Sequence, residues 1–187
     1  MQNDNQRYIY IVISQTGTML SRILKIITGA RYNHASISLS KDLQTMYSFG
    51  RLWAYNPFYG GFVQESLKYG TFRRFPNADV VVAAIPVAQE RYQQMEEFLA
   101  DMYLHRKKYH YNYIGLLMAG AKIHYCSKNT YYCSEFVRDV LIQFEVLDSE
   151  QFSPIVQPVH ILEQVKDYVI YRGKLKQYVA DKMIAQK

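Results

Sequence analysis

Cysteine is scarce in this chain. Of its 187 residues only Cys126 and Cys133 are cysteines, which is too few for a disulfide framework. No apolar run approaches the roughly 18 residues that a membrane-spanning helix needs. The first residues also lack the basic start, apolar centre and small-residue cleavage site of a secretory leader. We therefore expect a reduced, cytoplasmic protein without a transmembrane segment.

The composition is that of a globular protein. Hydrophobic residues make up 49% and charged residues 20%, which argues against disorder. A chain of this length suits one packed domain, and we expect residues 1–187 to form it. The balance of 22 basic against 16 acidic residues, a net charge of +6, favours anionic partners. Because this surplus is spread along the chain, it defines no basic arm.

The order of apolar and polar residues predicts a mixture of strands and helices. Strands are expected at residues 8–14, 34–40, 45–49, 62–65, 71–75, 79–85 and 168–171. Helices are expected between Thr18 and Gly29 and at residues 88–106, 113–121 and 130–146, with a turn or short helix at 158–165 and a basic helix after Gly173. No repeat or linker interrupts this order. The pattern predicts one α+β domain.

Cys133 is the first candidate for chemistry. It falls in the first turn of the predicted helix 130–146, where unsatisfied N–H groups and the helix dipole favour a thiolate. A reactive thiolate also needs a base, and an imidazole is the usual one. His34 begins a strand whose His and Ser residues alternate with apolar ones, so it is expected on the polar face of a half-buried strand. Spacing alone favours the alternative of an inert core cysteine, because Cys133 also lies on the apolar stripe of its helix.

Two segments together resemble a known superfamily. The block YNHASISL around His34 is followed about a hundred residues later by YYCSEFVRDVL around Cys133. This arrangement is similar to the circularly permuted branch of the NlpC-type papain-like superfamily, which includes YiiX-like amidases and lecithin–retinol acyltransferase-like enzymes. In that branch the His strand precedes the Cys helix, as it does here. The resemblance covers residues 8–144 and implies a Cys-bearing helix packed on an antiparallel sheet.

The resemblance also implies roles for particular residues. Cys133 would be the nucleophile and His34 the general base, while a third polar residue from the next strand would orient the imidazole. That residue is Ser48 in this chain, where other members have Glu or His. A serine orients an imidazole more weakly because it offers no full negative charge. Tyr47 or a backbone carbonyl is the alternative orienting group.

The implied reaction is acyl transfer through a thioester, with backbone N–H groups at the helix start holding the oxyanion. We expect hydrolysis of amide bonds in a peptide, amide or acyl substrate, with no cofactor and no metal. A lipid or N-acyl transferase, or an inactive member that binds a ligand, are the alternatives. The aromatic segment 53–62 is either a wall of the cleft or a loop held by its own rings. Arg51 either meets a substrate carboxylate or is solvated.

Two further interpretations follow from local clusters of residues. His124, Cys126 and Cys133 have the spacing H-x-C-x6-C, which lacks the short Cys-x2-Cys element of structural zinc sites, and a fourth ligand is not evident. The basic and aromatic run 105–113 could contact nucleic acid, but no nucleic-acid-binding signature accompanies it, so no such partner is expected. The basic tail could rest on anionic lipid, although a solvated terminal helix is favoured. The oligomeric state stays open.

Overall fold

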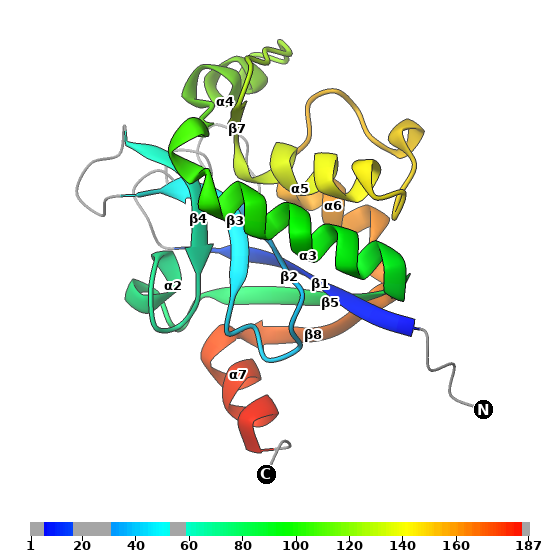
Figure 1. The fold of residues 1–187 in the computed structure, drawn as a ribbon. Helices are drawn as coiled ribbons and strands as arrows, with labels where there is room; N and C mark the ends of the chain where they lie inside the picture. Colours follow the sequence, from blue (N-terminus) through cyan, green and yellow to red (C-terminus); the bar gives the residue numbers. More distant parts are fainter. Residues whose placement is uncertain (1–5, 17–30, 53–58, 185–187) are drawn as a thin grey trace.

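The computed structural model describes residues 6–16, 31–52 and 59–184. The helix expected between Thr18 and Gly29 lies outside these ranges, as do residues 53–58 of the aromatic segment. The described part folds around one sheet that is covered by helices on both faces (Figure 1). This arrangement confirms the α+β class that the sequence predicts.

The sheet has eight strands in the order β7-β6-β4-β3-β2-β1-β5-β8. The strands are β1 (Gln6–Gln15), β2 (His34–Ser38), β3 (Met46–Arg51), β4 (Gly60–Glu65), β5 (Asp79–Ala88), β6 (His110–Tyr111), β7 (Thr130–Tyr131) and β8 (Val169–Lys174). Neighbouring strands pair antiparallel, except that β6 and β7 pair parallel. The sheet is therefore mixed, and the expectation of a wholly antiparallel sheet was wrong at this one pairing.

Helices cover the two faces unequally. The α-helices are α2 (Thr71–Arg74), α3 (Gln89–Leu104), α4 (Tyr113–Gly120), α5 (Cys133–Gln143), α6 (Pro158–Gln164) and α7 (Leu175–Ile184). Three short 3₁₀ helices, η1 (Arg106–Lys108), η2 (Ser149–Gln151) and η3 (Lys166–Tyr168), lie between them. The larger core, on one face, contains residues of α3, α5 and α6, and the smaller core, on the other, contains residues of α2 and α7. Within the described ranges, no helix combines the length and the apolar character needed to cross a membrane.

Strand β1 shows why both faces are covered. Ile9, Ile11 and Ile13 face the larger core, while Tyr10 and Val12 face the smaller one. All five are buried, because successive side chains of a strand point to opposite faces and each face meets a layer of helices. Burial of each such side chain stabilises the fold by about 1.5–3 kcal/mol. The sheet is thus a rigid platform for the ends of β2 and β4.

Two local predictions were wrong for identifiable reasons. Residues 71–75 are not a strand, because Gly70 adopts a positive φ of 71° that redirects the chain and α2 follows it. The single turn of α2 buries Phe72 completely. Strand β2 is also not half-buried: all of its residues are buried, the polar ones included. Its His and Ser side chains must therefore find partners within the protein.

Candidate active site

His34 lies at the first position of β2. The strand is central in the sheet, and His34 pairs with Ser14 of β1. Its side chain is almost fully buried, with 8% of the residue exposed. The ring of Phe72, carried by α2, packs against it with ring centroids 6.1 Å apart. Since a buried imidazole needs hydrogen-bond partners, the groups around its two ring nitrogens decide what it can do.

Glu65, the last residue of β4, is the partner of His34. Its Oε2 lies 2.7 Å from Nε2 of His34 and also accepts a hydrogen bond from the Ser36 hydroxyl at 3.2 Å. The carboxylate is fully buried. Gly50 of β3 lies between the two strands, where a Cβ would be 3.8 Å from Oε1 of Glu65 and 4.0 Å from Cε1 of His34. The small size of Gly50 thus leaves room for the two side chains to meet across β3.

The two buried charges shift each other's titration. Burial by itself would lower the pKa of His34, but the Glu65 carboxylate outweighs it and, together with a hydrogen bond to Cys133, raises the pKa of His34 to about 10. Burial would likewise raise the pKa of Glu65, and the attraction of His34 lowers it instead. Around neutral pH the site therefore holds an imidazolium paired with a carboxylate.

Cys133 is the first residue of α5. The helix forms because its apolar side chains recur at helical spacing and are buried against the sheet: Phe136, Val137, Val140 and Leu141. At its start, the backbone N–H of Tyr132 donates a hydrogen bond to Oε2 of Glu135 at 3.3 Å. The first turn of a helix presents N–H groups that have no acceptor within the helix. Cys133 therefore carries its thiol in this first turn.

The structure brings Cys133 and His34 together. Sγ of Cys133 lies 4.0 Å from the carbonyl oxygen of Asn33, the residue before His34, and a hydrogen-bonding interaction with the Cys133 side chain contributes to the raised pKa of His34. Because Nε2 of His34 faces Glu65, Nδ1 is the ring nitrogen that remains for the thiol. The thiol, imidazole and carboxylate thus form one connected row. Cys133 is 4% exposed, so the row is buried.

Tyr111 also contacts the thiol. The parallel pairing of Tyr111 with Tyr131 brings strand β6 beside the segment that leads into α5. Tyr111 is buried, and an interaction of its hydroxyl with the Cys133 side chain contributes to the pKa of Tyr111. Burial, with a smaller effect from Cys133, raises the pKa of Tyr111 well above its usual range, so the hydroxyl keeps its proton. A protonated hydroxyl beside a sulfur nucleophile is a hydrogen-bond donor in the place where charge would develop during acyl transfer.

Ser48 does not contact the imidazole in the described structure. Its hydroxyl donates a hydrogen bond of 2.7 Å to the carbonyl oxygen of Ala35. The register that pairs Ile37 with Tyr47, continued along the two strands, places Ser48 opposite Ser36 and leaves Gly50 opposite His34. The orienting position expected for Ser48 is therefore taken by Glu65, whose longer side chain reaches His34 from one strand farther away.

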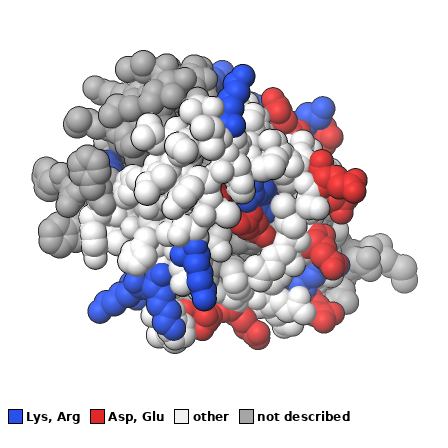
Figure 2. All heavy atoms as spheres, turned by 90° about the horizontal axis from the view of Figure 1, so that it is seen from above, with Lys and Arg blue, Asp and Glu red and all other residues white. Residues whose placement is uncertain are grey.

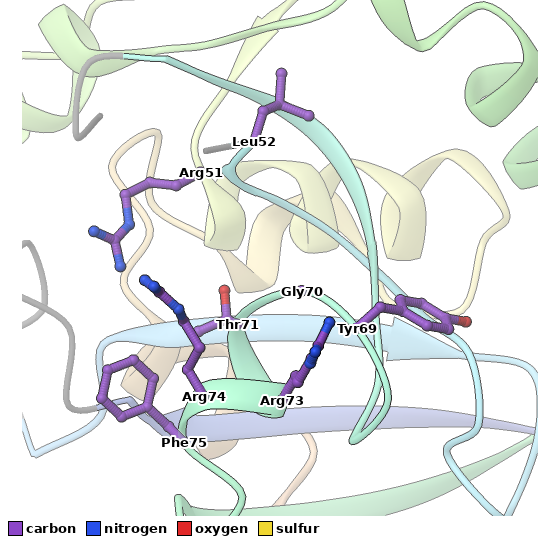
Figure 3. A pocket seen from close by; sticks show the side chains of 8 residues that line it. All are labelled: Arg51, Leu52, Tyr69, Gly70, Thr71, Arg73, Arg74 and Phe75. Atoms are coloured by element: carbon purple, nitrogen blue, oxygen red, sulfur yellow. The ribbon is translucent and has the colours of Figure 1, made fainter. Parts of the chain in front are cut away.

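A cavity of about 460 Å³ lies on the Glu65 side of the site. It is lined by Arg51, Leu52, Tyr69, Gly70, Thr71, Arg73, Arg74 and Phe75. In Figure 3 the side chains of Arg51 and Arg74 extend toward the same space, and the Thr71 hydroxyl is directed into it. Among the described residues that line this cavity none is acidic. The cavity therefore has a positive wall, and a second cavity that shares Arg51 with it extends to Glu65.

The other sequence-based candidates are not assembled into a site. His124 and Cys126 are exposed, whereas Cys133 is buried with His34, and within the described ranges no group of three His, Cys, Asp or Glu side chains could hold a metal ion. The hydroxyl of Tyr47, the alternative orienting residue, accepts a hydrogen bond of 3.3 Å from Nε2 of Gln64.

Comparisons with family models, with curated proteins and with solved structures find no match to this chain. Its function is therefore inferred from the geometry of the site.

Proposed function

We propose that the protein is a cysteine hydrolase of amide or ester bonds that works through a thioester on Cys133. The observation that carries this proposal is the row Cys133–His34–Glu65, in which a thiol at a helix start meets an imidazole that is held by a buried carboxylate. A thiol, a base and a group that orients the base are the parts that nucleophilic catalysis by cysteine requires. The permuted papain-like fold remains part of the proposal.

The proposed reaction starts from a Cys133 thiolate and a His34 imidazolium. Sulfur attacks the substrate carbonyl carbon, and the carbon–nitrogen or carbon–oxygen bond breaks as His34 gives its proton to the leaving group. Water then attacks the thioester while His34 takes one of its protons, and the carbon–sulfur bond breaks to restore the thiolate. In this proposal the backbone N–H of Cys133, in the first turn of α5, and the hydroxyl of Tyr111 donate hydrogen bonds to the developing oxyanion.

The arginine-lined cavity bears on the substrate. Arg51 and Arg74 line it, and Arg51 is close enough to Tyr113 to lower the pKa of that hydroxyl somewhat against the effect of burial. The ring of Tyr113 lies 4.6 Å from that of Tyr111, which contacts the thiol. A substrate that carries an anionic group beside its scissile bond therefore fits this site better than a neutral one.

The proposal is tested by the reactivity of the thiol. Iodoacetamide is added at about pH 6, where an ordinary thiol is almost fully protonated, and alkylation of Cys133 and of Cys126 is followed by mass spectrometry. Cys133 should react at least tenfold faster than the exposed Cys126, and His34→Gln should abolish the difference. The double variant His34→Gln/Glu65→Gln leaves no unpaired buried charge and serves as the folded control.

Turnover is tested with p-nitrophenyl acetate. Wild type and Cys126→Ser should release nitrophenol and carry one acetyl group on Cys133 during the reaction, and Cys133→Ser should do neither. Equal alkylation rates for the two cysteines would overturn the proposal. A fast thiol that accepts no acyl group from p-nitrophenyl acetate would favour the alternative, a binding module of the same fold.

A further inference from the structure

The end of the molecule that carries α4 exposes an unusual number of large apolar side chains. Ile114 and Leu117, one turn apart on α4, are 60% and 70% exposed, and Leu104 at the end of α3 is 74% exposed. Ile123 and Tyr125 follow in a segment, residues 121–129, in which every residue is exposed. Large apolar patches on a protein surface usually mark an interaction site.

The same end continues into the β3–β4 hairpin. Leu52, which follows β3, and Tyr59, which precedes β4, are exposed as well, and the backbone N–H of Leu52 donates a hydrogen bond to the carbonyl oxygen of Tyr59. The hairpin lies beside β6, because Gly61 pairs with His110. In Figure 1 α4 lies at the top of the molecule, and the described ends of β3 and β4 lie at its upper left. We call the exposed apolar residues of this end the α4 tip: Leu52, Tyr59, Leu104, Ile114, Leu117, Ile123 and Tyr125.

Basic residues outnumber acidic ones around the α4 tip, where the exposed Asp101, one turn before Leu104 on α3, pairs with His105. Between Asp101 and Glu135 the sequence has five Lys and Arg residues and no Asp or Glu. These residues are Arg106, Lys107, Lys108, Lys122 and Lys128, and all are exposed. Figure 2, which looks onto this end, shows a broad uncharged area with Lys and Arg side chains at its border, while most of the acidic side chains lie towards the right-hand edge.

We infer that the α4 tip docks onto an anionic lipid surface. Apolar side chains that project from a helix can enter the boundary between headgroups and acyl chains, while cations around them meet the lipid phosphates. The tip is a projection rather than a groove, since residues 121–129 and the outer side of α4 stand clear of the core. This shape suits insertion into a soft surface. The site differs from the basic tail, where Leu175, Tyr178 and Val179 of α7 are buried in the smaller core. The inference is independent of the thiol chemistry.

The test is sedimentation of the full chain with lipid vesicles. One set consists of phosphatidylcholine alone, and the other contains about one third phosphatidylglycerol, which supplies the negative surface charge. The wild type should bind the anionic vesicles at least tenfold more strongly than the neutral ones, and added salt should weaken the binding. Ile114→Glu/Leu117→Glu should abolish it. Tyr168→Glu/Ile170→Glu, at two apolar positions that are 40% and 49% exposed beside and on β8 at the opposite edge of the sheet, adds the same charge as a control and should bind as the wild type does.

The basic residues are tested separately. Lys107→Gln/Lys108→Gln should weaken binding to anionic vesicles by about fivefold for each lysine removed. Lys166→Gln/Lys176→Gln removes the same charge from exposed positions outside the tip and should have a much smaller effect. If the two double variants lose vesicle binding equally, net charge alone explains the binding, and the inference is overturned. An absence of vesicle binding by the wild type would also overturn the inference. If sedimentation velocity then shows a dimer that Ile114→Glu/Leu117→Glu dissociates, the α4 tip is instead an interface between two copies of the chain.

Discussion

His34 and Glu65 are 31 residues apart in the chain, yet Nε2 of the imidazole lies 2.7 Å from Oε2 of the carboxylate. Two strands carry them, with β3 between, and Gly50 of β3 leaves the space in which they meet. The pair is buried, so each charge depends on the other: removal of one partner would leave an uncompensated charge in the interior. This mutual dependence is the source of several measurable effects.

Glu65, rather than Ser48, should control the reactivity of the thiol. Glu65→Gln removes the negative charge that keeps His34 protonated, and alkylation of Cys133 at about pH 6 should slow by at least tenfold. Ser48→Ala removes only a hydrogen bond to the backbone, and the rate should stay within about twofold of wild type while stability falls by about 1–3 kcal/mol. Comparable rate losses in the two variants would return the orienting role to Ser48.

The stability of the pair should depend on pH in a defined direction. His34 has a raised pKa of about 10, so its contribution to stability is complete below the pKa of 6.5 that it has in the unfolded chain, and this contribution is lost as the pH rises towards 10. Glu65 has a lowered pKa, so its contribution to stability is present above the pKa of 4.5 that it has in the unfolded chain, and this contribution is lost as the pH falls. The stability advantage of the wild type over His34→Gln/Glu65→Gln, measured as the difference in free energy of unfolding, should therefore be largest between about pH 4.5 and 6.5. By about pH 10 this advantage should be smaller by an amount on the order of a few kcal/mol.

Urea denaturation at several pH values measures this difference. The double variant is the appropriate reference because other titrating groups are common to both proteins and cancel. A difference that grows steadily from acid to alkaline pH would contradict an ion pair between the two residues.

The sequence predicts the two ends of this site but not what joins them. The apolar stripe of α5 and its preceding polar residues place Cys133 at a helix start, and the alternation after residue 34 places His34 on a strand. The sequence did not predict Glu65, because the resemblance places the orienting residue on the strand after His34, whereas the long side chain of Glu65 reaches the imidazole from β4, one strand farther away. One signal was present: Glu65 is the only acidic residue between Asp42 and Asp79, and it ends an apolar strand.

Short elements were the least predictable. Tyr111 reaches the thiol through β6 and β7, which have two residues each and therefore no alternation to detect. The helix α2 is a single turn whose position depends on the positive φ of Gly70. Such elements are determined by contacts between distant parts of the chain rather than by local periodicity.

The hydroxyl of Tyr111 should matter for acyl transfer more than for thiol reactivity. Tyr111→Phe keeps the buried ring and removes the donor beside Cys133, so the turnover of p-nitrophenyl acetate should fall by about 10²-fold, as for the loss of one oxyanion donor. Alkylation by iodoacetamide develops no oxyanion and should change by less than about threefold. Parallel losses in both measurements would make Tyr111 a residue that only positions the thiol.

Gly50 should tolerate only a small side chain. A Cβ at this position would lie 3.4 Å from Cγ2 of Val63, which is ordinary contact, so Gly50→Ala should remain folded and reactive. Gly50→Val adds two methyl groups in the space between His34 and Glu65 and should destabilise the protein by about 1–3 kcal/mol. Alkylation of Cys133 and urea denaturation of both variants test this expectation. Full reactivity in Gly50→Val would show that the pair does not need that space.

The arginine-lined cavity should favour anionic reagents. N-chloroacetylglycine, which carries a carboxylate, and its neutral amide both alkylate thiols, and the ratio of their rates at Cys133 reports the preference for charge. Arg51→Gln and Arg74→Gln should each lower this ratio by about two- to fivefold, the range for partly exposed charge pairs. Arg7→Gln is the matched control, because Arg7 lies at the far end of β1 from Ser14, the residue that pairs with His34. A phosphate-bearing chloroacetamide, compared in the same way, distinguishes a phosphate preference from a carboxylate preference. If the ratio falls as much in Arg7→Gln as in the two cavity variants, net charge rather than the cavity attracts the anion, and the proposed class of anionic substrates loses its support.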